Sequence, residues 1–322
     1  MLISSPKTSR VTVMIASPDD FELLEAQVHK NVAIVPIKTP VNHKIDLLTL
    51  KKGFELGLVI VQECEHSTVN TIIVANKSVV PLLLVDGEEI VGGDQNRIID
   101  ATILIAPGSK MKVPVNCTEH GRWAFKHNFK QSENIANIQT RVAKIHAHRN
   151  HGSAQQAVWD SINELEMSRD FSSPTQAMSE SYENAKADLG EFLNAFEVVD
   201  GQSGVAVLVD GEMKGFEIFL NSEIYKEYHE KILKSYLINA EISDSVFTIN
   251  TDTIENVIEN ALNSEFEEFK NNGEEKRFEF SDDNGLGSLY TFQDNLIHMS
   301  YFTGSVDLDS ESHKIHQNDV RI

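Results

Sequence analysis

Short apolar runs separated by turn residues dominate the first third of the chain. Runs of this kind cover residues 11–16, 32–37, 58–63, 71–75, 79–85, 88–91, 98–105 and 110–115, and Asp86-Gly87 and Pro107-Gly108 separate several of them. Only 46–56 departs from this pattern, as a short helix candidate with Asp46 as its N-cap and Gly57 as its stop. Short strands with frequent turn signals favour an antiparallel sandwich or a barrel-like sheet.

The periodicity weakens between residues 126 and 153, where Asn, Gln, Lys and His prevail. We interpret this segment as a long connection with one helix near 133–145, and long connections in compact folds often carry function. The alternation of His146 and His148 could bind a metal or sense pH, although a flexible loop is the simpler interpretation.

Helical periodicity prevails in the remainder. Residues 154–167 form one amphipathic helix, and Ser173-Pro174-Thr175-Gln176 predicts the start of a second, whose apolar face runs from Met178 to Phe196. Further helices are predicted from Asn221 or Ser222 to Ala240 and over 254–269, the last with an acidic solvated face. Strands are expected at 205–209 and 214–219, and again at 277–280, 288–292 and 296–302.

Together these patterns predict an α+β fold. An N-terminal antiparallel β-rich, sandwich-like half would pack on a C-terminal helical half with a small sheet of its own. The expected divisions are a β-rich half at 1–125, a connection at 126–153, an α+β half at 154–303 and a polar tail at 304–322. We expect the two halves to form one compact unit.

The composition limits the cellular compartment and the classes of partner that we expect for the protein. The chain has 322 residues, two cysteines and a net charge of −21, with no apolar run of membrane-spanning length and no signal-peptide pattern. Low cysteine use favours a reducing cytoplasm. The negative charge argues against a nucleic-acid partner, because binding phosphates needs a positive field. No membrane partner is expected, and homo-oligomerisation stays open.

The stretch from Val80 to Arg97 ends in a dense set of polar groups beside two glycines. Asp86-Gly87 between apolar runs predicts a hairpin with a type I′ turn. Glu88 and Glu89 follow on a strand and should face opposite sides, so one of them could point into a pocket as a general base or acid. Amide groups at Gln95 and Asn96 and the planar fork of Arg97 would suit a ligand, and Arg97 in particular a phosphate. The alternative is a loop whose polar groups cap neighbouring backbone.

A second constellation is Cys117-Thr118-Glu119-His120-Gly121-Arg122-Trp123. Trp123 offers a stacking surface and Arg122 an anion contact. Cys117 and His120 have the spacing of half a zinc site, but the other half is missing, so no metal is expected. A nucleophilic pair of Cys117 and His120 stays open, because proximity in sequence does not establish its geometry.

One short pattern occurs twice. Leu84-Val85-Asp86-Gly87-Glu88 recurs as Leu208-Val209-Asp210-Gly211-Glu212. Either two hairpins converge on the same turn chemistry, or they present similar edges to one shared site, which Glu217 and the Trp123 loop would help to line. The sequence has no Walker phosphate loop, dinucleotide glycine fingerprint, HExxH or GxSxG motif.

At these positions the chain resembles a known family. The matching positions are Leu84-x-Asp86-Gly87-Glu88-Glu89-x-Val91-Gly92-x-x-Gln95-Asn96-Arg97, Pro114-Val115-x-Cys117-x-Glu119-x-Gly121-Arg122-Trp123, Gly204-Val205, Gly211-x-x-x-Gly215-x-Glu217-x-Phe219, and Lys234-Ser235-Tyr236 followed by Ala240. They look like the ARG and rhodanese-phosphatase-superfamily-associated protein domain, over roughly residues 30–243, with the region after Phe269 as an addition. The resemblance implies an association with ADP-ribosylglycohydrolases and phosphatases in bacterial NAD and ADP-ribose pathways, and so with bacterial conflict or antiviral defence.

The leading functional hypothesis is an enzyme that acts on an ADP-ribose-like or NAD-derived nucleotide without a cofactor. Glu88 or Glu89 would transfer the proton. The expected ligand-binding residues are Gln95, Asn96, Arg97, Glu119, Arg122, Trp123 and Glu217. A non-catalytic sensor or sequestering module for such a nucleotide is the alternative. A third is a structural or interaction protein whose acidic face around 255–268 meets a partner.

Overall fold

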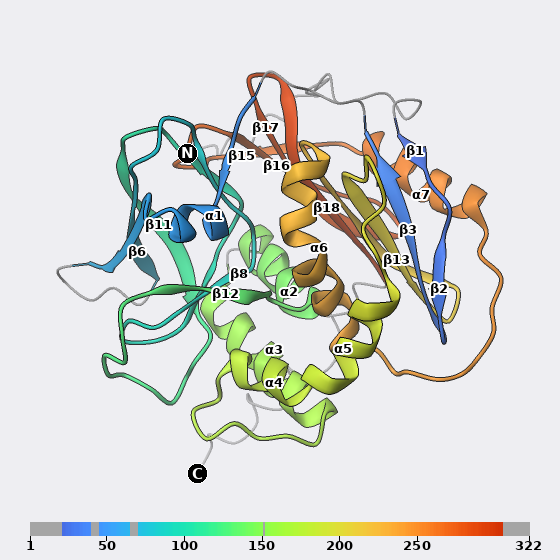
Figure 1. The fold of residues 1–322 in the computed structure, drawn as a ribbon, viewed down its shortest axis with the longest axis horizontal. Helices are drawn as coiled ribbons and strands as arrows, with labels where there is room; N and C mark the ends of the chain where they lie inside the picture. The colour runs from blue at the N-terminus through green and yellow to red at the C-terminus, as the bar shows by residue number, and fades with distance from the viewer. Residues whose placement is uncertain (1–20, 40–44, 65–69, 151, 305–322) are drawn as a thin grey trace, which may run out of the picture.

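The computed structural model describes residues 21–39, 45–64, 70–150 and 152–304, which form seven helices and eighteen strands. The helices are α1 (Leu50–Glu55), α2 (Ile138–Arg149), α3 (Ala154–Ser168), α4 (Met178–Asn184), α5 (Lys186–Ala195), α6 (Ser222–Leu237) and α7 (Thr251–Leu262). The strands form three sheets, and groups of helices are interleaved with groups of strands along the chain (Figure 1).

The largest sheet has nine strands drawn from both ends of the chain. Its order is β1 (Glu22–Leu23), β3 (Val32–Lys38), β13 (Gly204–Val209), β14 (Glu212–Phe219), β18 (Asn295–Thr303), β17 (Gly285–Phe292), β16 (Lys276–Ser281) and β15 (Glu267–Phe269), with β2 (Gln27–His29) also on β3. β3 pairs with β13 over its whole buried length, from Val32 opposite Val209 to Ile37 opposite Gly204. The expected separation into an N-terminal β-rich half and a helical half with a small sheet is therefore wrong, although the α+β class is right.

The other two sheets hold the rest of the N-terminal strands. Six strands follow the order β12 (Lys130–Ile135), β8 (Glu88–Val91), β9 (Arg97–Ile99), β11 (Lys110–Cys117), β6 (Thr71–Asn76) and β5 (Val59–Glu63). Three more follow the order β10 (Ile103–Ile105), β7 (Leu82–Leu84) and β4 (Leu48–Thr49). β7 and β8 thus belong to different sheets, and the single run expected at 98–105 is two strands.

Apolar side chains fill three regions between these layers. One core lies between the nine-stranded sheet and helices α2 to α6, and it includes Phe219, Tyr228 and Leu233. A second lies on the opposite face of the same sheet, where Ile254 and Ile258 of α7 pack against it. The third fills the space enclosed by the two smaller sheets. The nine-stranded sheet is therefore covered on both faces, which explains why β3 and β13 are apolar at every position that faces either core.

Several predicted boundaries shift. α1 begins after Thr49, whose hydroxyl accepts from Lys52 N, so Asp46 is not its N-cap. The turn at 173–176 precedes α4 rather than starting it, and its Ser173 hydroxyl accepts from Ala177 N. The predicted helix over 254–269 ends at Leu262, and Phe269 lies in β15.

The segment 126–153 contains regular structure. It holds β12 and α2, and the interpretation of His146 and His148 as parts of a flexible loop is wrong because both lie in α2. The predicted strand at 11–16 and the polar tail from residue 305 lie outside the described residues. In the described ranges, every helix is too short or too polar to cross a membrane.

Candidate functional site

The first Asp-Gly turn lies inside the protein. Glu88 N donates to Val85 O at 3.0 Å, and Gly87 has φ +76° while Asp86 keeps a negative φ. One positive φ, at the third position, defines a type II turn. The expected type I′ hairpin is therefore wrong here, because the flanking strands β7 and β8 pair with other partners.

Two cations of α2 meet the carboxylate of this turn. Arg141 Nε lies 3.0 Å from Asp86 Oδ2, and Lys144 Nζ lies 2.5 Å from Asp86 Oδ1. Lys144 also donates to the backbone oxygens of Ile99 and Asp100. Burial raises the pKa of Asp86, but the charges of Lys144 and Arg141 outweigh it and hold that pKa below its usual value. The turn is thereby fixed to α2 and to the end of β9.

Arg141 links this turn to Glu217 of β14. Its Nη1 and Nη2 lie 2.5 and 3.2 Å from the two carboxylate oxygens of Glu217, and its guanidinium stacks 4.8 Å from the Phe302 ring centroid. His298 Nε2 contacts Glu217 Oε2 at 3.1 Å, and its Nδ1 contacts Thr102. We call Asp86, Arg141, Lys144, Glu217 and His298 the buried ion network. Two carboxylates face two basic side chains within it, and all five residues are at most 5% exposed.

The second Asp-Gly turn differs in form and place. Asp210 and Gly211 have φ +53° and +81°, and β13 and β14 pair on either side, so this is the predicted type I′ hairpin. Asp210 is exposed and accepts from the Ser245 hydroxyl at 2.7 Å, while Gly211 packs beside Phe247. The expectation that both turns and the Trp123 loop line one cleft is wrong, because the first turn is enclosed in the core and the second faces outward.

Glu88 and Glu89 point in opposite directions, as their alternation predicts. Glu88 lies 2.9 Å from Lys231 Nζ and accepts from the Tyr228 hydroxyl at 3.1 Å, both from α6. Glu89 accepts from Ser132, Asn134 and Thr118 at 2.8, 3.3 and 3.3 Å. Burial raises the pKa of Glu89, with these hydrogen bonds acting against it, and no ion pair joins it to a cation in the part of the chain that the structure describes.

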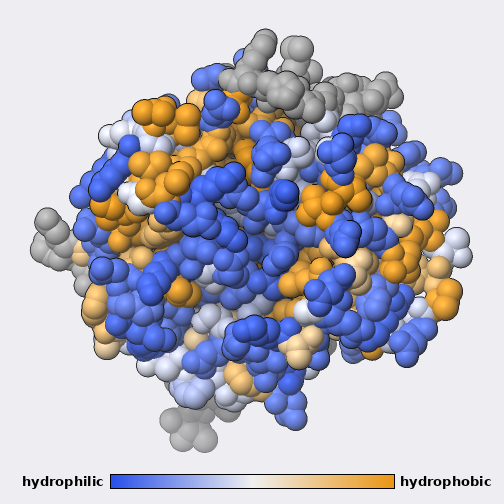
Figure 2. Space-filling view, viewed as in Figure 1, coloured by the Kyte–Doolittle hydropathy of each residue, from blue (hydrophilic) through white to orange (hydrophobic). Residues whose placement is uncertain are grey.

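Apart from Thr118, these partners of Glu88 and Glu89 come from β12 and α6, which lie side by side near the middle of Figure 1. Hydrophilic residues gather over this part of the surface in Figure 2, with hydrophobic patches to either side. Both carboxylates are nevertheless fully buried. Neither touches solvent in this conformation, so a substrate would reach them only after the overlying side chains moved.

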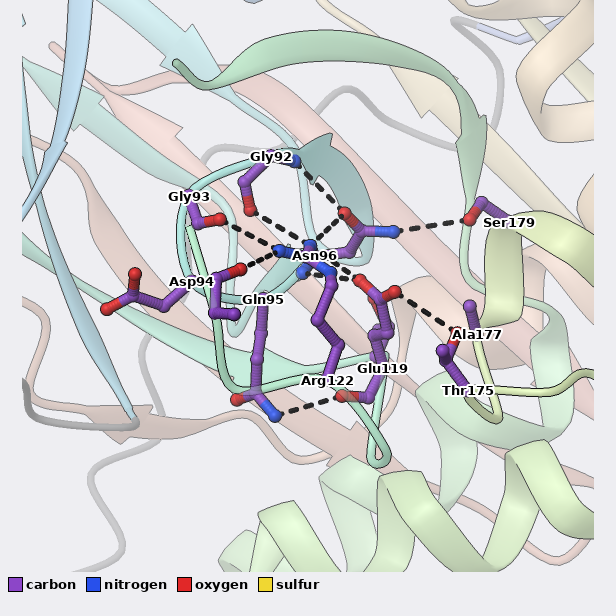
Figure 3. A network of polar contacts seen from close by, with 12 residues as sticks. Gly92, Gly93, Asp94, Gln95, Asn96, Glu119, Arg122, Thr175, Ala177 and Ser179 are labelled. Carbon is purple, nitrogen blue, oxygen red and sulfur yellow. Dashed lines mark hydrogen bonds and ion pairs between the residues drawn. The ribbon is translucent and has the colours of Figure 1, made fainter. Parts of the chain in front are cut away.

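Asn96, Glu119 and Arg122 form a compact polar network (Figure 3). Arg122 pairs with Glu119 at 2.6 Å and donates to Asn96 Oδ1 and to the backbone oxygens of Gly92 and Gly93. Burial raises the pKa of Glu119, but the hydrogen bond and charge of Arg122 outweigh it and lower that pKa. The guanidinium therefore holds the Gly92-Gly93 loop and the 119–122 turn together. This arrangement fits the alternative in which the polar groups of the loop cap neighbouring backbone.

Gln95 and Arg97 are also committed to internal contacts. Gln95 Nε2 donates to Glu119 O at 2.9 Å, and Arg97 Nη1 donates to Gln95 Oε1 at 3.3 Å. The thiol of Cys117 donates to the same Gln95 oxygen, and burial raises its pKa to about 11. A thiol kept neutral in this way is a poor nucleophile, which argues against the Cys117–His120 pair.

The Trp123 side chain lies outside this network. Trp123 and Phe125 are 59% and 66% exposed, on the segment that Arg122 fixes from beneath. The structure thus brings four of the predicted ligand residues together, namely Gln95, Asn96, Glu119 and Arg122. Arg97 lies beside them, Trp123 projects outward, and Glu217 belongs to the buried ion network.

A sizeable cavity lies elsewhere, between α2, α3 and the ends of β17 and β18. Its volume is about 680 Å³. Apolar walls come from Ile138, Val142, Ala143, Ala157, Leu286 and Phe302, and polar groups from Gln139, His146, Asn150, Gln156, Asp160 and Glu164. We call this cavity the α2–α3 groove. Sequence reasoning missed it because α2 lacks a clear apolar period. One signal was present: Arg141 and Lys144, three residues apart, share the opposite face of that helix.

In the described ranges, no group of three or more His, Cys, Asp or Glu residues is arranged to hold a metal ion. The groups described above are the buried carboxylates Glu88 and Glu89, a loop held by Arg122, and an open groove with amide and carboxylate groups at its edges.

The protein has an α+β fold in which buried charged residues link the three sheets. Asp86 lies between strands of the two smaller sheets, and Arg141 joins it to Glu217 of the nine-stranded sheet. The chain belongs to the ARPP-1 family, the ARG and Rhodanese-Phosphatase-superfamily-associated Protein domain, whose model matches residues 20–302. The match includes β15 to β18, so the region after Phe269 is not an addition to the family domain. Searches among curated proteins and among solved structures found no match to the chain.

Proposed function

We propose that the protein is a non-catalytic binding module that takes a nucleoside-like small molecule in the α2–α3 groove. The observation that carries the proposal is the groove itself. Its volume of about 680 Å³ lies within the range of small-molecule sites, about 300–1,000 Å³, and apolar walls with a few polar groups are typical of such sites. Gln95, Asn96, Arg97, Glu88 and Glu89, in contrast, are at most 5% exposed and hydrogen-bonded internally.

The groove chemistry favours a sugar and a ring over a phosphate. Asp160 and Glu164 can accept from ribose hydroxyls, and the amides of Gln139 and Gln156 can both donate and accept. Lys and Arg are missing from the described lining, so a diphosphate would meet carboxylates instead of cations. The ligand class expected from the sequence thus narrows to the nucleoside part of an ADP-ribose-like or NAD-derived molecule.

The test is calorimetry with adenosine, ADP-ribose and NAD. Ala143→Trp should fill the groove and abolish binding, while Ala187→Trp, on the exposed face of α5, should leave binding unchanged. Adenosine should bind at least as tightly as ADP-ribose. The proposal fails if none of the three binds at millimolar concentration, or if Ala143→Trp binds like the wild type.

An enzyme acting on the same class of molecule is the second candidate, and Glu89 is the observation that favours it. A buried carboxylate with a raised pKa and no cation partner among the described residues resembles a general acid. Mass spectrometry after incubation with NAD or ADP-ribose separates the two candidates. Product formed by the wild type and lost in Glu89→Gln would establish the enzyme, whereas ligand recovered intact would support the binding module.

Glu89→Gln also has a stability readout that is independent of activity. Because the folded-state pKa of Glu89 is raised, folding is favoured at low pH and weakened as pH rises through that pKa. Glutamine keeps the shape and removes the charge, so urea unfolding should find Glu89→Gln more stable than the wild type at neutral pH, with a smaller gap in acid. Equal stability at both pH values would contradict a raised pKa.

A further inference from the structure

Two exposed aromatic side chains lie on the Trp123 loop, which comprises residues 120–127. Trp123 and Phe125 are both more than half exposed. The loop is fixed from beneath, because Arg122 donates to Gly93 O at 2.9 Å and to a backbone oxygen of the loop itself at 2.7 Å. Large aromatic side chains on a fixed surface loop are typical of a contact with a protein partner, since little conformational freedom is lost on binding.

A second exposed apolar segment, residues 241–246, lies on the connection from α6 to α7. Val246 is 97% exposed and Ile242 is 38% exposed. This segment is fixed as well, because the buried Asn31 side chain donates to Glu241 O at 2.8 Å and accepts from the backbone N–H two residues further on at 3.0 Å. Two aliphatic side chains are therefore exposed on a segment whose backbone is held in place.

The Trp123 loop is basic within an acidic chain. The chain has a net charge of −21, yet residues 120–130 include Arg122, Lys126 and Lys130 and no acidic residue. Lys126 and Lys130 are exposed, and neither pairs with a carboxylate in the described ranges. The loop is therefore suited to a partner surface that combines acidic and apolar side chains.

The 241–246 segment has this complementary character. Glu241 and Asp244 are exposed and alternate with its aliphatic side chains, and the segment has no lysine or arginine. The neighbouring Lys30 already pairs with Glu191 at 2.8 Å. The segment thus offers two free carboxylates beside two aliphatic side chains, where the Trp123 loop offers cations beside two aromatic rings.

The two surfaces lie far apart on one molecule. In Figure 1 the Trp123 loop leads into β12 on the left, whereas the connection from α6 to α7 lies on the right. A contact between them therefore joins two copies of the chain. Contacts between different surfaces of identical chains are heterologous, and they extend from copy to copy unless the arrangement closes into a ring.

We propose that the protein associates with itself head to tail, with the Trp123 loop of one copy on the 241–246 segment of the next. The aromatic side chains would pack on the aliphatic ones, and Lys126 would approach Asp244. A second copy is the partner that fits, because the chain itself carries both complementary surfaces. Neither surface includes a residue that lines the α2–α3 groove, so this inference does not depend on the proposed function.

Sedimentation velocity of the wild type over a range of protein concentrations tests the association. At about 0.1 M salt the Debye length is about 10 Å, so the net charges of two copies are largely screened while charges in contact still attract. The mean mass should rise with protein concentration under these conditions, and about 1 M salt should weaken the association about fivefold. A wild type that stays monomeric at millimolar concentration in about 0.1 M salt overturns the proposal.

Single substitutions locate the contact. Trp123→Ser and Val246→Ser each remove an apolar side chain from one surface and should weaken the association about tenfold or more. Met167→Ser changes a side chain that is equally exposed but lies outside both surfaces, so it should associate like the wild type. Because all three residues are exposed, circular dichroism should show wild-type folding for each variant. Equal losses in all three variants, or no loss in the first two, would overturn the proposal.

Mixing the two variants tests the head-to-tail arrangement. Trp123→Ser keeps an intact 241–246 segment, and Val246→Ser keeps an intact Trp123 loop. An equimolar mixture should therefore form a complex of two chains and nothing larger, at concentrations where each variant alone is monomeric. A mixture that stays monomeric, or that forms assemblies as large as those of the wild type, contradicts this arrangement.

Discussion

The two Asp-Gly turns share five letters of sequence and little else. Asp86 is buried, lies between strands of different sheets and pairs with Arg141 and Lys144, whereas Asp210 is exposed at the tip of a regular hairpin beside Ser245. A glycine with positive φ is what the two turns have in common. The Asp-Gly sequence therefore specifies that the chain reverses direction. Residues distant in the sequence determine whether the aspartate is buried in the core or exposed on the surface.

The largest test of this contrast is the pair Asp86→Asn and Asp210→Asn. Removing the charge of Asp86 leaves Arg141 and Lys144 buried against one carboxylate, which should destabilise the protein by about 3–5 kcal/mol. Asn tolerates the left-handed conformation at position 210, so that variant should unfold like the wild type. Urea unfolding followed by circular dichroism measures both. Similar losses in the two variants would show that the turns are energetically alike.

Alanine at the two glycines should separate the turns by a smaller amount. Both Gly87→Ala and Gly211→Ala incur the left-handed cost of about 1–2 kcal/mol. At Gly87 the added Cβ would also lie 3.2 Å from the Arg141 side chain and 3.3 Å from Ala136, which adds about 1–3 kcal/mol of crowding. The Cβ at Gly211 would meet Phe247 at an ordinary 3.4 Å. Denaturation midpoints should rank wild type, Gly211→Ala and Gly87→Ala in falling order, and the reverse order for the two variants would refute the crowding.

The smallest effect is a difference in pH dependence. The folded-state pKa of Asp86 is lowered, because the nearby cations outweigh burial, so its stabilisation is complete above the unfolded-state pKa and is lost as pH falls through the folded value. The stability gap between the wild type and Asp86→Asn should therefore be widest near neutral pH and narrow in acid. Thermal unfolding across that range measures it. A gap that stays constant would mean that the charge of Asp86 does not stabilise the fold.

Elements with strong local signals were predictable from the sequence. The hairpin at Asp210-Gly211, helix α6 with its N-cap Asn221, and the three C-terminal strands lie where the pattern places them. The pairing of β3 with β13 was not predictable from the sequence, because each is an apolar strand that could pair with many others. The break between α4 and α5 at Ala185 also leaves no mark, since the apolar residues on both sides keep one helical period.

The sequence predicted which residues cluster at the candidate site, but it did not predict that they are buried. The clustering of Gln95, Asn96 and Arg122 follows from a glycine-rich loop with many polar groups, and their contacts fit the alternative in which such groups cap the backbone. The role of Arg141 depends on Asp86 and Glu217, which lie far from it in sequence. Contacts between residues so far apart leave no local pattern in the sequence. The α2–α3 groove escaped prediction for another reason, since α2 lacks a clear apolar period.

The position of β3 has a consequence for how the chain is made. This early strand lies inside the nine-stranded sheet, bonded to β13 on one edge, and the sheet continues through β14 to β18 from the end of the chain. During synthesis β3 is made long before its partner β13. Until β13 is made, the edge of β3 that pairs with it stays exposed, and such exposed edges slow folding and promote aggregation. The nine-stranded sheet is therefore complete only after β18 has been synthesised, and a variant that lacks β18 should be less soluble because β14 keeps an open edge.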